Sequence, residues 1–304
     1  MIFLLLSIIC SVSIAHVFRY VQEKSLPMFG LFAVNYFVGF CVAVWGSDEA
    51  FWRQWSPFLF VLGGIIGILF VCSYVLMVLS IRKLGVTIPI SLMRLSSVLP
   101  TFGSIIFFAE VPSVLQFSGI VLAFLALPLA TQESLSCSNL AKLFHNGFGW
   151  GLLLFGVFGV TNFIFKIQHE IVPLYNPYHF LALLFPVAFL VSCLMLLRYK
   201  TFTAQTGMEL RSDLTTYDEI TPRSSRNILC AGLILGMLNL FSNYFFMKSL
   251  QQLPGIVVYP INGVGIILLS AVTSLFLWQE RLLKKNYLFI ALASLALLLI
   301  YPRS

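Results

Sequence analysis

Arg94 is the residue whose type and position most directly suggest chemistry, because it is a charged side chain inside an apolar run. An arginine within a membrane-spanning helix is costly, so function is its default interpretation. If residues 86–108 form one helix, Arg94 lies on one face with hydroxyl residues: Thr87, Ser91, Ser97 and Thr101. This stripe predicts that Arg94 neutralises an anionic group of a substrate. The alternative is that Arg94 snorkels to the interface or pairs with carbonyls at a helix C-terminus.

Uncharged polar side chains in other apolar runs form the second set of candidates. Such a side chain more often bonds a neighbouring helix than a ligand, and that alternative stays open for each of them. Together with Arg94, Ser91, Ser97 and Thr101, the predicted substrate-binding residues are Asn162, Asn239, Asn243, Tyr259, Asn262 and His16. Pro260 lies between Tyr259 and Asn262, and a proline within a helix frees a carbonyl toward a cavity. His16 is the candidate for a group that titrates within a span.

The remaining charged residues and the cysteines predict no second site. Every Asp and Glu lies in a connection or at a helix end, which disfavours proton coupling through a carboxylate in mid-membrane. The six cysteines include no C-x-x-C pair, so we expect no metal site and no cofactor. Lys166 and Lys248 are interpreted as anchors at the membrane interface. Glu110 is interpreted as a structural residue at a helix end.

The composition defines the environment of these residues. Of 304 residues, 60% are hydrophobic and 10% are charged, whereas soluble domains have about 25% charged residues. The chain is therefore expected to be an integral membrane protein. The longest polar stretch, at about 198–227, is too short for a soluble catalytic domain. The net charge of +7 comes from short clusters between apolar runs, so we expect the lipid bilayer as a partner and no nucleic acid. The oligomeric state stays open.

Charged residues, Pro and Gly divide the chain into apolar segments that predict ten transmembrane helices. They are 2–18, 28–46, 57–80, 86–108, 113–131, 148–165, 177–197, 228–249, 255–278 and 286–301. An all-α bundle follows, because every backbone polar group in hydrocarbon must be satisfied within the protein. Gly63-Gly64-x-x-Gly67 and Gly232-x-x-x-Gly236 predict close packing of helices, inside one chain rather than in a dimer.

The sequence contains an internal repeat. A shift of 170 residues places Tyr74 on Tyr244 and Glu110 on Glu280, and a shift near 147 aligns the regions before them. Residues 1–135 are therefore predicted to form a first five-helix repeat, and 147–304 a second repeat with the polar loop at about 198–227. Because five is odd, the second copy enters the membrane from the opposite side. Inverted repeats of this kind are typical of secondary transporters, with the substrate site near the midplane.

Motifs at equivalent places in the two halves carry a family resemblance. Phe108-Ala109-Glu110, Trp278-Gln279-Glu280-Arg281 and Gly159-x-Thr161-Asn162-Phe163-x-x-Lys166 resemble motifs of the drug/metabolite transporter superfamily, and the ten-helix EamA-like family is the most similar branch. The run from Tyr259 to Ile266 is similar to helix 9 of bacterial EamA-like members. The resemblance implies a carrier in the bacterial inner (plasma) membrane that works by alternating access. It would export or import a small polar metabolite, anionic if Arg94 binds it.

A polytopic membrane enzyme or a receptor is the alternative function. An enzyme would need clustered nucleophiles, acids or metal ligands, but the four histidines are dispersed and His169-Glu170 lacks the second histidine of a zinc-protease motif. A receptor would need a sizeable extramembrane module. We therefore expect a transporter and not an enzyme.

Loop charges predict the orientation of the chain in the membrane. Thirteen Lys and Arg residues lie in the connections on one side, whereas only Arg53, Lys166, Lys248 and Arg303 lie on the other. Because basic loops stay in the cytoplasm, a reporter fused after Ser304 should report a C-terminus outside it. The family resemblance implies both termini inside, so a cytoplasmic reporter would show that the charge-based orientation is wrong.

Overall fold

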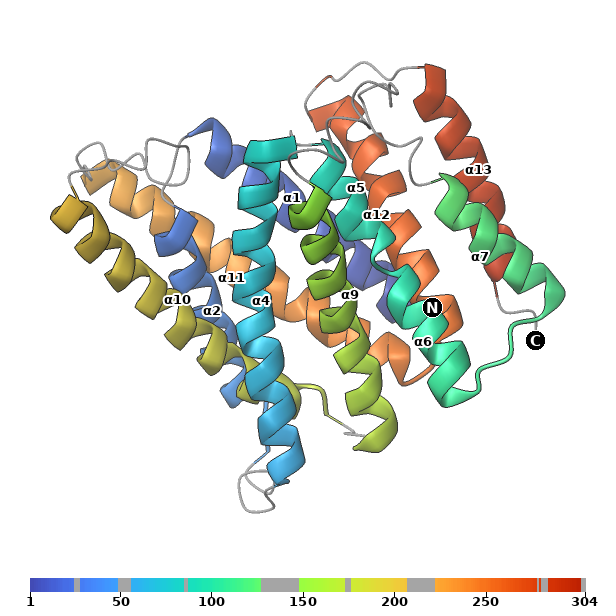
Figure 1. Cartoon of the computed structure of the whole chain (residues 1–304), viewed down its shortest axis with the longest axis horizontal. Helices are drawn as coiled ribbons and strands as arrows, with labels where there is room; N and C mark the ends of the chain where they lie inside the picture. The colour runs from blue at the N-terminus through green and yellow to red at the C-terminus, as the bar shows by residue number, and fades with distance from the viewer. Residues whose placement is uncertain are drawn as a thin grey trace. The chain divides into compact units, whose positions relative to one another are not determined.

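The computed structural model describes residues 1–24, 28–48, 56–84, 87–126, 148–172, 176–206, 222–277, 279 and 284–301. All regular secondary structure in these ranges is α-helix, and no residue in them forms a β-strand. The helices, labelled in Figure 1, are α1 (Ile2–Glu23), α2 (Met28–Trp45), α4 (Pro57–Leu84), α5 (Thr87–Leu95), α6 (Val98–Phe108), α7 (Val114–Ala126), α9 (Phe148–Ile171), α10 (Tyr178–Thr206), α11 (Pro222–Leu250), α12 (Gly255–Leu277) and α13 (Lys284–Ile300).

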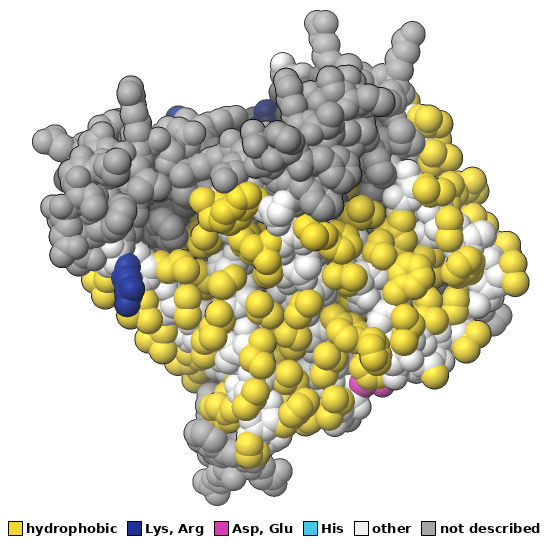
Figure 2. All heavy atoms as spheres, in the orientation of Figure 1, with side chains coloured by type: hydrophobic (Ala, Val, Ile, Leu, Met, Phe, Trp, Pro, Cys, Tyr) yellow, Lys and Arg dark blue, Asp and Glu magenta, His cyan; other side chains and the backbone are white. Residues whose placement is uncertain are grey.

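Within the described ranges, six helices are long and apolar enough to cross a bilayer, so the chain is a membrane protein. The spans are Ile2–Val21, Pro57–Met77, Gly149–Ile171, Tyr178–Arg198, Arg226–Leu250 and Gly255–Leu277. Shorter apolar helices cover Gly30–Trp45, Leu92–Phe108, Val114–Ala126 and Tyr287–Ile300. Hydrophobic side chains cover most of the described surface in Figure 2. Phe107 and Phe276, for example, are 72% and 78% exposed, as expected of side chains that face lipid.

The chain divides into two compact units, and each unit takes segments from both halves of the sequence. The first unit comprises Met1–Ile8, Cys72–Pro173 and Met247–Ser304, and the second comprises Ile9–Val71 and Leu174–Phe246. This division follows spatial contacts, whereas the predicted boundaries at 135 and 147 follow sequence similarity. Those boundaries therefore stay a prediction.

Close helix packing through glycine holds the second unit together. The α2–α10 pair is its most extensive helix contact, and the ring centroids of Tyr36 and Phe185 lie 6.3 Å apart within it. Gly63 and Gly67 of α4 face Leu183 and Leu184 of α10. On α11, Gly232 faces Val34 and Gly236 faces Asn35, both on α2. The predicted packing of these glycines inside one chain is confirmed.

Helix α12 is the centre of the first unit. Every residue from Gly255 to Ile266 is buried except Asn262, which is half-buried. Helix α12 packs on α5, α6, α7 and α13, while α5 and α6 also pack on α9. A helix that is apolar on all sides can be surrounded in this way. Figure 1 shows α7 and α13 side by side, and Gly119 of α7 approaches Leu299 and Ile300 of α13.

Two predicted segments differ from the observed helices in ways that affect function. The described part of the segment predicted at 86–108 forms two helices, α5 and α6, because the chain turns at Ser96 and Ser97. The segment expected at 148–165 continues as helix to Ile171, so Lys166 lies within α9 and not beyond its end. Both ends of the polar region at 198–227 are helical too, since α10 continues to Thr206 and α11 begins at Pro222.

Adjacent glycines of α4 allow a matched test of this packing. A β-carbon at Gly63 would lie 2.7 Å from the β-carbon of Leu183, whereas a β-carbon at Gly64 would have no neighbour within 4 Å. We expect Gly63→Ala to destabilise the protein by about 1–3 kcal/mol through overpacking, and Gly64→Ala to be neutral or to stabilise it by up to about 1 kcal/mol. Thermal unfolding in detergent measures both changes. Equal melting temperatures for the two variants would contradict the packing described for α4 and α10.

Candidate functional site

One face of α12 organises the polar residues of the first unit. Gly255, Tyr259 and Gly263 are spaced by four residues, so they lie on the same face of this helix. A β-carbon at Gly263 would lie 3.0 Å from Ser97 Oγ, and Gly255 closely approaches Ser104. Helix α12 therefore runs antiparallel along α6. The lack of side chains at the two glycines allows the backbones to approach.

The turn between α5 and α6 lies at the Gly263 end of this face. Pro100, in the first turn of α6, has no N–H to bond the carbonyl of Ser96, so the regular helical pattern cannot continue through this point. Ser97 Oγ donates a hydrogen bond to the carbonyl of Arg94 at 2.8 Å, and Thr101 Oγ1 donates one to the carbonyl of Ser97 at 2.8 Å. Both hydroxyls are buried, as the polar stripe predicts, but their protons are used on the backbone. The side chain of Ser91 lies outside the described residues.

Arg94 lies in the last turn of α5, where the carbonyls carry partial negative charge. That location contributes about 0.3–1 kcal/mol, whereas placing an arginine in mid-membrane costs about 2.5–3.5 kcal/mol. The helix end therefore offsets only part of the cost. No carboxylate among the described residues pairs with Arg94, and the side chain that interacts with it electrostatically is Tyr74 of α4. An anionic ligand would supply the missing counter-charge.

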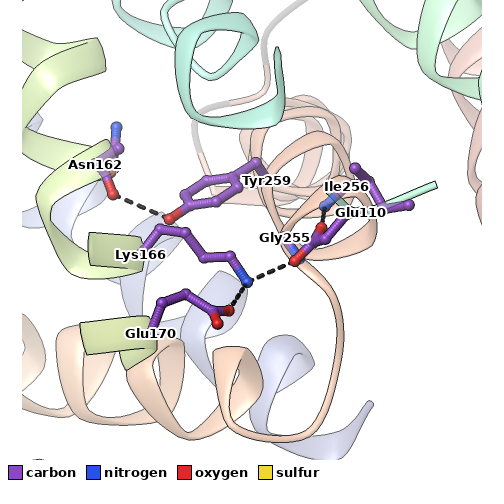
Figure 3. A network of polar contacts seen from close by, with 7 residues as sticks. All are labelled: Glu110, Asn162, Lys166, Glu170, Gly255, Ile256 and Tyr259. Carbon is purple, nitrogen blue, oxygen red and sulfur yellow. Dashed lines mark hydrogen bonds and ion pairs between the residues drawn. The ribbon is translucent and has the colours of Figure 1, made fainter. Parts of the chain in front are cut away.

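The Gly255 end of the α12 face carries a buried ion-pair network centred on Lys166 (Figure 3). Lys166 Nζ lies 2.5 Å from Glu110 Oε1 and 2.6 Å from Glu170 Oε1. Lys166 is only 2% exposed, against 13% for Glu110 and 36% for Glu170. A buried ammonium needs paired carboxylates to offset its lost hydration. The interpretation of Lys166 as an anchor at the membrane interface is therefore wrong.

Glu110 also caps the start of α12. The backbone N–H groups of Gly255 and Ile256 donate hydrogen bonds to Glu110 Oε1 and Oε2 at 2.9 and 2.8 Å. These N–H groups have no partner within their own helix, and a negative charge is favourable at a helix N-terminus. The preceding residue, Ala109, has a left-handed backbone with φ 52°, which ends α6 and turns the chain. The contacts support a structural role for Glu110. Glu280 lies outside the described residues.

The motif of α9 attaches this helix to α6 and α12. Asn162 uses its backbone carbonyl, which accepts a hydrogen bond at 3.0 Å from the hydroxyl of Tyr259. Gly159 provides room for Leu99, and the ring of Phe163 lies 5.9 Å from Phe107 and 6.0 Å from Phe108. Tyr259 is thus committed to a structural bond, while a ligand role for the side chain of Asn162 stays a prediction.

Some buried polar atoms of the first unit lack a hydrogen-bond partner among the described residues. They are Asn262 Oδ1 on α12, Ser104 Oγ on α6 and Ser73 Oγ on α4. A buried polar group without a partner costs about 1–3 kcal/mol, so native proteins seldom leave one without reason. Asn262 was predicted as a substrate ligand, and its free acceptor is available for a donor on a bound molecule.

The other predicted residues lie in the second unit. Asn243 Nδ2 donates to Asn239 Oδ1 at 3.0 Å, and Asn239 Nδ2 donates to Asn35 Oδ1 of α2 at 3.3 Å. The bond to Asn35 favours the interhelical alternative for Asn239, whereas the bonds of Asn243 stay within α11 and its ligand role stays a prediction. Asn35, which is 1% exposed, was not a candidate, and only its polarity within an apolar segment could have indicated it. His16 lines a groove described below.

Sequence reasoning did not include Lys166, Glu110 and Glu170 among the site residues. The signal was present, since Lys166 ends the motif that begins at Gly159 and Glu110 belongs to the repeat. The sequence did not show that these distant segments contact one another. Within the described ranges, no group of three His, Cys, Asp or Glu side chains could hold a metal ion.

The chain has a similar full-length relative and a similar solved structure. No known protein-family profile matches it. It is 22% identical over 316 residues to an uncharacterised protein of Haemophilus influenzae, covering 98% of this chain and 97% of that protein. The fold is also similar to that of another protein whose crystal structure has been solved. The two match with a TM-score of 0.71 and 11% sequence identity, over 99% of this chain and 96% of the other. The chain therefore shares its fold with a protein of known structure. A sequence identity of 11% does not show that the two share an activity.

The two glutamates of the Lys166 network allow a matched comparison. We expect Glu110→Ala to lower the free energy of unfolding by about 3 kcal/mol or more, because it breaks a buried ion pair and uncaps α12. Glu170→Ala should cost less, because Glu170 is 36% exposed and Lys166 keeps its ion pair with Glu110. Chemical denaturation in detergent measures both variants. Similar losses for the two would show that Glu110 does not anchor α12.

Proposed function

We propose that the protein is a secondary membrane carrier that moves a small polar metabolite with an anionic group by alternating access. The carrier would have ten transmembrane helices arranged as two inverted five-helix repeats. The observation that carries the proposal is Arg94, a cation at an interrupted membrane helix with no carboxylate partner among the described residues. Interrupted helices near the midplane are a common way for transporters to form substrate sites.

The packing of equivalent helices supports the inverted repeat. The three most extensive helix contacts within the units are α2–α10, α7–α13 and α6–α12. Each joins a helix of the first predicted repeat to its own counterpart in the second. A two-fold relation brings equivalent elements together at its axis, as in a symmetric dimer. The left-handed backbones add support, since Ala109 and Gln279 are 170 residues apart and both have φ 52°.

The Lys166 network fits a mechanism of alternating access. Glu110 follows α6, contacts Lys166 of α9 and caps α12, so one carboxylate joins three segments at the Gly255 end of the α12 face, away from Arg94 at its Gly263 end. A contact of this kind would hold this end closed in one conformation and break in the other. Glu280 occupies the equivalent position in the second repeat, and we propose that it serves the opposite end.

The proposal also includes the protein family and the membrane in which the protein is located. The motifs around Glu110 and Lys166 support membership of the EamA-like branch of the drug/metabolite transporter superfamily. The similarity to a Haemophilus influenzae protein supports a bacterial origin, and the inner membrane is proposed on the family resemblance alone. The proposal does not specify the direction of transport or the coupling ion, and transport measurements would determine both.

Transport by purified protein in proteoliposomes tests the role of Arg94. Across a panel of anionic, zwitterionic and neutral metabolites, we expect the wild type to move an anionic compound. Arg94→Ala should reduce that transport by about 10–100-fold, because a hydrogen bond to a charged group contributes about 1.5–3 kcal/mol. Arg198→Ala, which removes an exposed arginine on α10, is the matched control. Unchanged transport of every substrate by folded Arg94→Ala would remove the basis of the proposal.

A further inference from the structure

A groove lies between α1 and α11 in the second unit, and His16 is the predicted substrate residue among those that line it. Its volume is about 410 Å³, within the usual range of about 300–1,000 Å³ for ligand sites. The hydroxyls of Ser11 and Ser242 join the two helices by a hydrogen bond of 2.8 Å. The groove begins farther along, at His16 of α1 and Ile234 of α11. The helices therefore touch at the serines and border a wedge-shaped space beyond them.

Most of the lining of the groove is apolar, and its polar residues lie mainly toward one end. Tyr20 and Asn227 lie near the end of α1 and the start of α11, while His16 lies one turn deeper on α1. Val17, Ala231 and Ile234 line the rest. Asn227, Ala231 and Ile234 are spaced by four and three residues, so they share one face of α11. The groove thus has a polar mouth near the membrane surface and an apolar floor toward the membrane interior.

The flanks of the groove face hydrocarbon. Tyr20 and Ile234, which line it, are 43% and 54% exposed. Leu229 and Leu233, beside the groove on α11, are exposed as well. A soluble metabolite would gain little from this surface. A lipid chain would remain in contact with its neighbours in the bilayer while lying in the groove.

Basic residues predominate near the polar mouth, although α1 also ends at the acidic residue Glu23. Arg19 lies one turn after His16 on α1, Lys24 follows the helix, and Arg226 precedes Asn227 on α11. Basic residues at the membrane surface attract anionic lipids by about 1 kcal/mol each. Tyr, His and Asn side chains can all donate hydrogen bonds to phosphate oxygens.

We propose that this groove binds one anionic phospholipid. The phosphate lies at the polar mouth, near Asn227 and Tyr20, and Arg19 and Arg226 supply the charge complementarity. One acyl chain follows Val17 and Ile234 into the groove. The site rests on the membrane location of the chain and is independent of the transport function.

Native mass spectrometry of the detergent-purified full-length protein tests the site. With equal amounts of phosphatidylglycerol and phosphatidylcholine of the same acyl chains, we expect at least about threefold more retained phosphatidylglycerol. Cys230→Trp fills the groove and should abolish this excess, because Cys230 is an exposed lining residue. Cys41→Trp alters the exposed cysteine of α2 in the same unit and should retain the excess. Equal retention of the two lipids, or an excess that survives Cys230→Trp, overturns the proposal.

A second measurement uses the unaltered protein in case Cys230→Trp fails to fold. Peptide mapping follows the alkylation of Cys230 and Cys41 by a maleimide in detergent micelles. Added phosphatidylglycerol should slow alkylation of Cys230 several-fold and leave Cys41 unchanged, while phosphatidylcholine should slow neither. Equal effects of the two lipids on Cys230, or equal slowing of both cysteines, would exclude a specific anionic lipid in the groove.

Discussion

The hydrocarbon of a bilayer offers no hydrogen bonds, so each interruption of a helix must be satisfied by the protein itself. This constraint accounts for where polar side chains lie in the first unit. At the turn between α5 and α6, the hydroxyls of Ser97 and Thr101 donate hydrogen bonds to the backbone carbonyls of Arg94 and Ser97. At the start of α12, Glu110 bonds the exposed N–H groups. Polar residues therefore gather at helix ends that lie inside the protein.

Lys166, which is buried, and Arg94, which is half-buried, meet the same energetic cost in different ways. Lys166 has two carboxylates within 2.6 Å, so its charge is neutralised by the chain itself and it links α9 to the start of α12. Arg94 has an aromatic hydroxyl side chain and a helix end, which compensate only in part. A cation that is fully neutralised by the chain suits a structural role, whereas one that is only partly neutralised can bind an anionic group of a ligand.

The sequence was sufficient to place the helices and several of their contacts. Apolar runs of about twenty residues are set by the thickness of the bilayer, and glycines such as Gly63 and Gly232 indicated where helices approach. The turn at Ser96 and Ser97 was not foreseen, because the hydroxyl residues were interpreted as one face of a continuous helix. Pro100 was the available signal. The pairing of Lys166 with Glu110 could not be predicted, since periodicity describes single helices and not which distant helix ends meet.

The interleaved units have a consequence for how the protein is made. Synthesis proceeds from the N-terminus, so α2 and α7 enter the membrane before α10 and α13, against which they pack, exist. The core of neither unit is complete until segments of the second half have been added. The first half must therefore wait in the bilayer as separate helices whose glycine-lined faces are covered by lipid or by a chaperone. Domains often fold one after another during translation, but here assembly is a late event that depends on the last helices to be inserted.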